Sequence, residues 1–114
     1  MKVIFLIGPY RGESHWQTLR NIEAARNDAA ELWMRGYACI CPHLNTSFMS
    51  GLTAEMTFLE GYHEILRRCD AALVSPYWKR SEGSRAEVNV ALANQIPVYF
   101  SLEELTEGKS TNVS

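Results

Sequence analysis

One carboxylate, Glu87, closes the polar segment "SEGSRAE" at residues 81–87, directly before the helical pattern "VNVALAN". The free N–H groups and the dipole at a helix N-terminus favour an anion. Ser81 and Ser84 add hydroxyl donors at the same place. This segment is therefore a candidate site for a phosphate, with a carboxylate close by.

Two interpretations of Glu87 follow from its spacing. Ser84-x-x-Glu87 fits a capping box, in which the glutamate folds back onto the serine amide. Alternatively, a carboxylate kept ionised by the helix dipole is a suitable nucleophile for an oxocarbenium-like carbon, as in retaining glycoside hydrolysis. A ribosyl ring would then separate the carboxylate from the phosphate. We hypothesise that Glu87 caps the helix without substrate and attacks when substrate is bound.

A second polar segment, "GPYRGES" at residues 8–14, contains two glycines, an arginine and a hydroxyl group. The glycines Gly8 and Gly12 let the backbone approach a ligand closely, and Arg11 can bind a phosphate through two parallel hydrogen bonds. The segment is neither a dinucleotide fingerprint nor a Walker loop, and a plain turn with a solvated arginine is the alternative.

The pattern of apolar residues alternates between strands and helices. Strands are predicted at "KVIFLIG", "YACIC", "DAALVS" and "PVYFS". Helices are predicted from Leu19 to Trp33 with a C-cap at Gly36, from Phe58 to Leu66, over residues 84–94, and briefly over "LEELTE". Residues 43–53 are expected to form a polar loop. This order predicts an α/β fold, a flavodoxin-like three-layer αβα sandwich with a parallel sheet of four to five strands, in the order 2-1-3-4.

This topology places the two polar segments together. In such sheets, ligands bind beyond the carboxyl ends of the strands, where the winding direction reverses. That point lies between the first and third strands, which lead into "GPYRGES" and "PYWKRSEGSRAE".

Length and composition narrow the function classes. The 114 residues predict a single domain over residues 1–106 with a flexible tail at 107–114. A net charge of −2 with mixed signs argues against nucleic-acid or anionic-membrane partners. No apolar run approaches the ~20 residues of a membrane span. Three cysteines without framework spacing suggest reduced thiols and a cytoplasmic protein, and we expect neither a metal nor a cofactor.

Three motifs in order resemble the nucleoside 2-deoxyribosyltransferase superfamily, which includes the 2′-deoxynucleoside 5′-monophosphate N-glycosidases. They are "GPYRG", "RCDAAL" and "GSRAEVNVALANQIPVY", within a resemblance that covers most of residues 2–100. The resemblance implies Glu87 as the nucleophile. It also implies phosphate binding by Gly8, Arg11, Gly12 and Ser81. Tyr10, Gly83 and Ser84 complete the predicted phosphate site. Family members are usually dimers or larger assemblies whose site a neighbouring subunit completes.

Two positions depart from the family's pattern. Tyr62 stands where the family usually has an aspartate that helps to protonate the leaving base. Glu60, His63 or Glu64 could replace this acid, but they flank Tyr62 on the helix instead of sharing its direction. Phe5 stands where the family tends to have a tyrosine that bonds the nucleophile. Asp70 is expected to be structural, because it lies at the wrong end of its strand.

Several side chains are candidates for contacts with the base. His43, Asn45 and Tyr62 are candidate base or lid contacts, although a solvated loop histidine is the plainer interpretation of His43. Phe48 and Met49 lie in a loop with Gly51 that is a candidate lid. Four aromatic side chains could stack on a base, namely Tyr10, Trp16, Tyr77 and Trp78, and Trp16 and Trp78 could equally fill a dimer interface.

Two functions from different classes therefore remain. The first is a nucleotide N-glycosidase or deoxyribosyltransferase-like enzyme that acts on (deoxy)nucleoside 5′-monophosphates. The second is a non-catalytic nucleotide-binding or sensor module of the same fold. In either case the partner is a small-molecule nucleotide, and a homodimer or higher homo-oligomer is expected.

Overall fold

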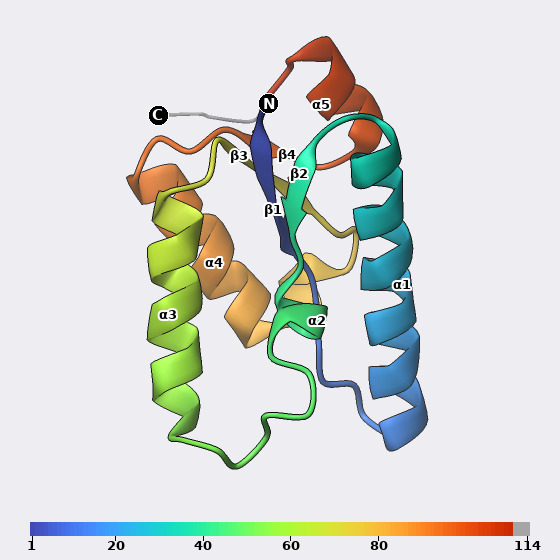
Figure 1. Ribbon diagram of the computed structural model, residues 1–114, viewed down its shortest axis with the longest axis vertical. Helices are drawn as coiled ribbons and strands as arrows, with labels where there is room; N and C mark the ends of the chain where they lie inside the picture. Colours follow the sequence, from blue (N-terminus) through green and yellow to red (C-terminus); the bar gives the residue numbers. More distant parts are fainter. Residues whose placement is uncertain (111–114) are drawn as a thin grey trace.

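A four-stranded parallel sheet forms the centre of the computed structural model, which describes residues 1–110 (Figure 1). Its strands are β1 (Val3–Ile7), β2 (Ala38–Ile40), β3 (Ala71–Val74) and β4 (Val98–Tyr99). They lie in the order β2-β1-β3-β4, so the predicted fold class and strand order are confirmed.

The helices cover both faces of this sheet. They are α1 (His15–Met34), α2 (Pro42–Asn45), α3 (Glu55–Arg67), the 3₁₀-helix η1 (Trp78–Arg80), α4 (Glu82–Ala93) and α5 (Leu102–Glu107). Helices α3 and α4 lie on one side of the sheet, and α1 and α5 lie on the other (Figure 1).

Alternate residues of β1 divide the core into two layers. Phe5 and Ile7 belong to the cluster under α3 and α4, whereas Ile4 and Leu6 belong to the cluster under α1 and α5. This division follows from the period of two in a strand. Each side chain is almost fully buried, and burying one of this size contributes about 1.5–3 kcal/mol. The apolar side chains of β1 therefore pack the sheet against the helix layers on both of its faces.

Local signals fix the ends of α1. The Ser14 hydroxyl accepts a hydrogen bond from the Gln17 amide at 3.1 Å and caps the N-terminus. At the other end, Gly36 follows the C-cap residue Arg35 with a φ of 88°, a left-handed conformation that favours glycine. The predicted stop at Gly36 is therefore confirmed.

The predicted loop over residues 43–53 contains a helix. Pro42 occupies the first turn of α2, where its missing N–H leaves no helical hydrogen bond unmade. The helix is only one turn long, which is too short for a periodic apolar pattern to reveal it. It turns the chain sharply after β2, towards α3.

The end of the chain differs in part from the predicted flexible tail at 107–114. Glu107 is the last residue of α5, and the Lys109 amide donates to the Glu104 carbonyl at 2.9 Å. Gly108 caps this helix with a φ of 72°. Residues 111–114 lie outside the described part, and the division at residue 106 stays a prediction.

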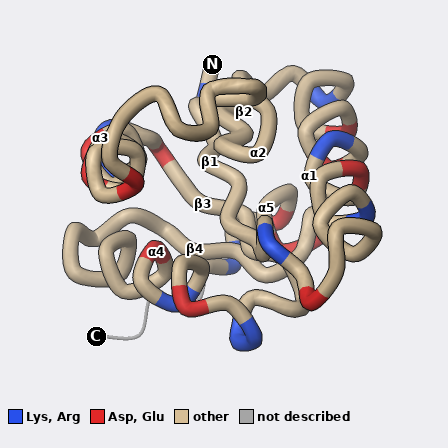
Figure 2. Tube along the Cα trace, turned by 90° about the horizontal axis from the view of Figure 1, so that it is seen from below, with Lys and Arg blue, Asp and Glu red and all other residues tan. Residues whose placement is uncertain are grey.

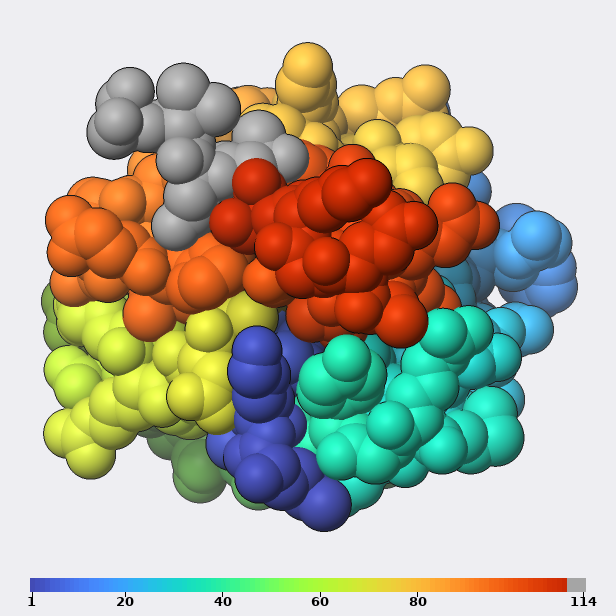
Figure 3. Space-filling view, turned by 90° about the horizontal axis from the view of Figure 1, so that it is seen from above, coloured from blue at the N-terminus to red at the C-terminus, as the bar shows by residue number. Residues whose placement is uncertain are grey.

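The amino ends of the strands carry structural contacts. At the amino ends of the strands, Asp70 accepts a hydrogen bond from the Val3 amide at 2.7 Å, in the structural role that was expected. Seen from above, α5 lies over part of this end of the molecule, beside the exposed start of the chain (Figure 3). Among the described residues, no helix is long and apolar enough to cross a membrane.

Candidate functional site

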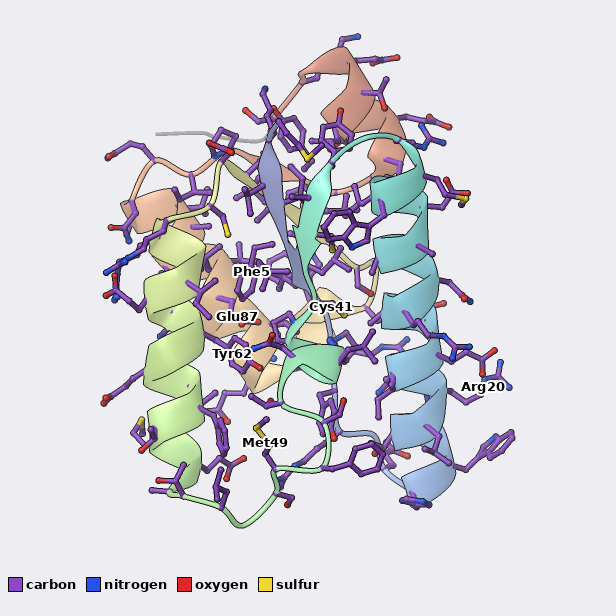
Figure 4. All side chains as sticks on the ribbon, viewed as in Figure 1. Phe5, Arg20, Cys41, Met49, Tyr62 and Glu87 are labelled. Carbon is purple, nitrogen blue, oxygen red and sulfur yellow. The ribbon has the colours of Figure 1, made fainter. Side chains whose placement is uncertain are left out.

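A cavity of about 780 Å³ lies at the carboxyl ends of the strands, between the loop after β1, α2 with its following loop, α3 and the start of α4. It brings together the predicted site residues Gly8, Tyr10, Arg11, His43, Tyr62, Ser81, Gly83, Ser84 and Glu87. The candidate lid residues Phe48, Met49 and Gly51 line it too. Figure 4 shows Tyr62 and Glu87 reaching into this region from α3 and α4, with Met49 on the same side of the sheet.

Two predicted residues lie outside the lining of this cavity. The Gly12 amide donates to the Thr18 hydroxyl at 3.0 Å. A Cβ at position 12 would lie 2.3 Å from Cγ of Gln17, so this glycine allows the loop to pack closely on α1. Asn45 is exposed on α2. The structure therefore does not place Gly12 or Asn45 against a ligand in this cavity.

The N-terminus of α4 is capped by Ser81, which corrects the predicted helix start at residue 84. The Ser81 hydroxyl accepts a hydrogen bond from the Ser84 amide at 3.1 Å. Glu87 is consequently the sixth residue of the helix, one turn too far along for a capping box. The capping interpretation of Glu87 is therefore wrong, because Ser81, three residues before the predicted helix start, is the cap.

We expect the variants Ser81→Ala and Ser81→Asp to distinguish the role of residue 81 as a helix cap from its proposed role in anion binding. Alanine removes the cap and should lower the free energy of unfolding by ~1 kcal/mol. Aspartate is a good cap and should retain most of this stability, but its charge should repel a phosphate. Urea unfolding and phosphate-ester titration of both variants check this. Equal binding by Ser81→Asp and wild type would contradict an anion site at this helix end.

Ser84 lies next to this cap and is almost completely buried, with 1% of its surface exposed. Its hydroxyl lines the cavity and has no hydrogen-bond partner among the described residues. Buried hydroxyls normally find a partner. An acceptor atom of a ligand at the head of α4 would supply one.

Glu87 is partly buried in the cavity, and its carboxyl group has no hydrogen bond or ion pair within the described residues. Burial raises the pKa of Glu87 to about 8 from an ordinary value of 4.5. The carboxyl group is therefore mostly neutral at pH 7 in the free protein. This corrects the expectation that the helix dipole keeps it ionised, because Glu87 lies beyond the first turn, where the dipole acts most strongly.

The raised pKa predicts how stability changes with pH. Between pH 4.5 and about 8 the folded protein retains a proton on Glu87 that the unfolded chain releases. The contribution of Glu87 to stability is therefore complete below pH 4.5 and is lost as pH rises to about 8. We expect Glu87→Gln to gain stability relative to wild type across this window, on the order of a few kcal/mol. Urea unfolding at several pH values measures the difference, and a constant difference would contradict the assignment.

Arg11 reaches the mouth of the cavity in an exposed position. Its guanidinium lies 3.3 Å from the Glu55 carboxylate, and both side chains are mostly solvent-exposed. Such a pair is weak and easily exchanged for another anion. Arg80, which the sequence reasoning missed, lines the same cavity and stacks on the Tyr77 ring at 4.9 Å. Its place in "KRSEGS", directly before the helix cap, was the available signal.

Tyr62 forms part of the cavity wall and is tied to α2 and the loop after it. Its hydroxyl lies 2.8 Å from the Thr46 hydroxyl and 3.3 Å from the Pro42 carbonyl oxygen. Its ring packs edge-on against Phe5, with centroids 6.4 Å apart. Tyr62 therefore holds the two walls of the cavity together, and Phe5 is in the core instead of on the cavity surface.

His43 is buried, with 7% of its surface exposed, and this corrects the interpretation as a solvated loop histidine. Its Nε2 atom lies 2.8 Å from the Pro9 carbonyl oxygen, so Nε2 carries the hydrogen and donates it. Burial lowers the pKa of His43, and Nδ1 has no partner in the described part. His43 is a neutral side chain that fixes the loop after β1.

A smaller cavity of about 360 Å³ lies on the α1 side of the sheet. It shares Leu6, Gly8 and His43 with the first cavity, and Trp16 and Tyr77 line it. Trp78 instead packs on Phe100 at 5.7 Å, against the core under α4. Of these three aromatic candidates, none lines the larger cavity.

Charge on the molecule is mixed, as the composition predicted. Figure 2 shows basic and acidic residues interspersed along α1 in the view from below. The charged residues that line the larger cavity are two arginines, Arg11 and Arg80, and three glutamates, Glu55, Glu82 and Glu87. The site therefore combines two arginines and a helix N-terminus with three carboxyl groups.

Fold and site together define a flavodoxin-like α/β protein with a cavity at the carboxyl edge of its sheet. Residues 2–101 match the family model described as "Domain of unknown function (DUF7768)". The chain belongs to this family. No curated protein matches it.

Two solved structures share this fold. One is a 2-deoxyribosyltransferase from the psychrotolerant bacterium Bacillus psychrosaccharolyticus, with a TM-score of 0.60 and 16% identity over 84% of this chain and 69% of that one. The other is a conserved protein from Enterococcus faecalis V583, with a TM-score of 0.65 and 20% identity over 86% of this chain and 61% of that one. The chain therefore spans about six tenths of the Enterococcus protein. At these identities the likeness shows the fold.

Proposed function

We propose that the protein is a nucleotide N-glycosidase or deoxyribosyltransferase-like enzyme that cleaves the glycosidic bond of (deoxy)nucleoside 5′-monophosphates. The observation that carries this proposal is the arrangement of one cavity. Its lining includes the carboxyl group of Glu87, which has no partner among the described residues, one turn along α4 from a helix N-terminus where the Ser84 hydroxyl is unpartnered too. The shared fold with a 2-deoxyribosyltransferase supports the same reaction class.

The proposed roles follow from this arrangement. Arg11, Arg80 and the α4 amides bind the 5′-phosphate, because two guanidinium groups and a helix N-terminus favour an anion. The sugar then lies between the phosphate and Glu87. The ionised Glu87 attacks C1′, the base leaves, and water hydrolyses the resulting ester or a second base accepts the sugar.

The alternative, a nucleotide-binding module without catalysis, also has an observation in its favour. Glu87 is mostly neutral at pH 7, and the Tyr62 hydroxyl is already hydrogen-bonded within the protein. A neutral carboxyl group is a poor nucleophile, yet it would not repel a phosphate.

Base release distinguishes these two functions. We expect the protein to release free base from at least one nucleoside 5′-monophosphate, measured by chromatography across purine and pyrimidine ribo- and deoxyribonucleotides. The corresponding 5′-hydroxyl nucleosides are the control, because they lack the phosphate. Tight binding without any base release would favour the binding module.

We also propose a homodimer with the cavity near the interface. Phe48, Met49 and Leu52 are exposed in the loop beside the cavity, and Met56 and Leu59 are exposed on the adjoining end of α3. A small domain gains buried apolar area when such a surface pairs. Light scattering at micromolar concentration should give twice the chain mass, and a monomer would contradict this proposal. The cytoplasmic location stays a prediction.

A further inference from the structure

Cleavage of an N-glycosidic bond usually requires a proton for the departing base. A base that is uncharged in the nucleotide leaves with the bonding electron pair and becomes an anion unless an acid protonates it. A positioned general acid typically contributes 10²–10⁴-fold to the rate. In this protein, such an acid would have to come from the residues that line the larger cavity.

The enclosed tyrosine and histidine side chains of the cavity, Tyr62 and His43, do not offer a free proton. The Tyr62 hydroxyl is held between the Thr46 hydroxyl and the Pro42 carbonyl oxygen. His43 donates its Nε2 hydrogen to the Pro9 carbonyl oxygen, and its Nδ1 is a bare acceptor. Tyr10 is half exposed, with its ring tilted against His43 at 5.6 Å.

The other polar residues are no better placed. Glu55 is paired with Arg11 at the mouth, and Glu82 is exposed in the first turn of α4. Arginine keeps its proton in proteins, and serine or threonine hydroxyls are weak acids. Among the described lining residues, Glu87 is the one enclosed carboxyl group, and the proposed reaction uses it as the nucleophile.

This combination, an enclosed carboxyl nucleophile without an enclosed acid, suits one class of leaving group. Resting on the proposed function, we infer that the site acts on ribosyl 5′-monophosphates whose base is a cation at the glycosidic nitrogen, such as an N-ribosylpyridinium. Such a base departs as a neutral molecule and needs no proton.

The cavity also has the chemistry to hold a cationic base. Glu87 has no counter-ion in the described structure, and a pyridinium ring beside it would supply one and favour its ionised form. Phe58 and Tyr62 present aromatic rings on the same lining, and aromatic faces attract cations. The positive charges of Arg11 and Arg80 balance the negative charge of the 5′-phosphate.

The covalent step balances without an additional reactant. A lone pair of the Glu87 carboxylate forms a bond to C1′, and the electrons of the C1′–N bond return to the pyridinium nitrogen, which becomes neutral. One negative and one positive charge are thereby removed. Water then hydrolyses the ester, giving ribose 5-phosphate, the regenerated carboxylate and one proton released to solvent.

The test compares two forms of a single nucleotide. Nicotinamide mononucleotide carries a pyridinium ring, and its reduced form carries an uncharged dihydropyridine of nearly the same shape. The full chain is incubated at pH 8, near the pKa of Glu87, with each form and with uncharged-base monophosphates, and base release is followed by chromatography. We expect release from the oxidised form to be at least roughly 100-fold faster than from any uncharged-base nucleotide.

Two variants and two outcomes make the result decisive. Glu87→Gln should abolish release, and Glu31→Gln, which changes a surface carboxylate on α1 outside both cavities, should not affect it. Equal or faster release from uncharged-base nucleotides would overturn this inference and leave the proposed function standing. An absence of release from every nucleotide would overturn both.

Discussion

Glu87→Gln is expected to fold like the wild-type protein and to lose base release by roughly 10³-fold or more. Glutamine has nearly the shape of the neutral carboxylic acid that Glu87 forms in the free protein, where burial raises its pKa to about 8. The cavity around it should therefore keep its structure. An amide cannot form the glycosyl ester, so the chemical step should fail.

The same assignment predicts a pH profile. Only the ionised carboxylate attacks, so kcat/KM of the wild-type protein should rise with pH and level off above about 8, the pKa of the free protein's Glu87. The control is Glu31→Gln, whose substituted side chain pairs with Arg35 on α1. Wild-type activity in Glu87→Gln, or a profile that falls through this range, would show that another group is the nucleophile.

Arg11→Ala is expected to weaken monophosphate binding by roughly tenfold or more and to leave binding of the matching nucleoside unchanged. A hydrogen bond to a charged group contributes about 1.5–3 kcal/mol, which corresponds to roughly 10- to 150-fold in affinity. Arg11 is 74% exposed and Arg80 lines the same cavity, so the effect should lie near the lower end of this range. Calorimetric titration of both ligands measures it.

Matched variants make this result specific. Arg67→Ala removes an exposed arginine that pairs with Glu64 on α3, outside both cavities, and it should bind both ligands normally. Glu55→Gln releases Arg11 from its ion pair and should strengthen phosphate binding slightly. If Arg11→Ala weakened nucleotide and nucleoside binding equally, Arg11 would only shape the loop, and the phosphate site would lie elsewhere.

The sequence by itself determined the architecture and brought most of the candidate site residues to one edge of the sheet. Continuous apolar runs such as "KVIFLIG" are typical of strands that are buried on both faces, and helical patterns between them permit only parallel connections. Topology then brought the segments after β1 and β3 to one edge, and most predicted site residues share one cavity there. These features depend on the period and order of residues, which are local properties of the chain.

Only the tertiary structure decided the state of the individual side chains. The pKa of Glu87 depends on its burial in a cavity whose lining comes partly from α2, the loop after it and α3, which are distant in the sequence. His43 and Tyr62 owe their roles to contacts with Pro9 and Thr46, which are 34 and 16 residues away. The start of α4 depended on whether Ser81 or Ser84 caps the helix, and serine is a common helix cap at either position. Desolvation and hydrogen bonding act through space, so neighbours along the chain could not reveal them.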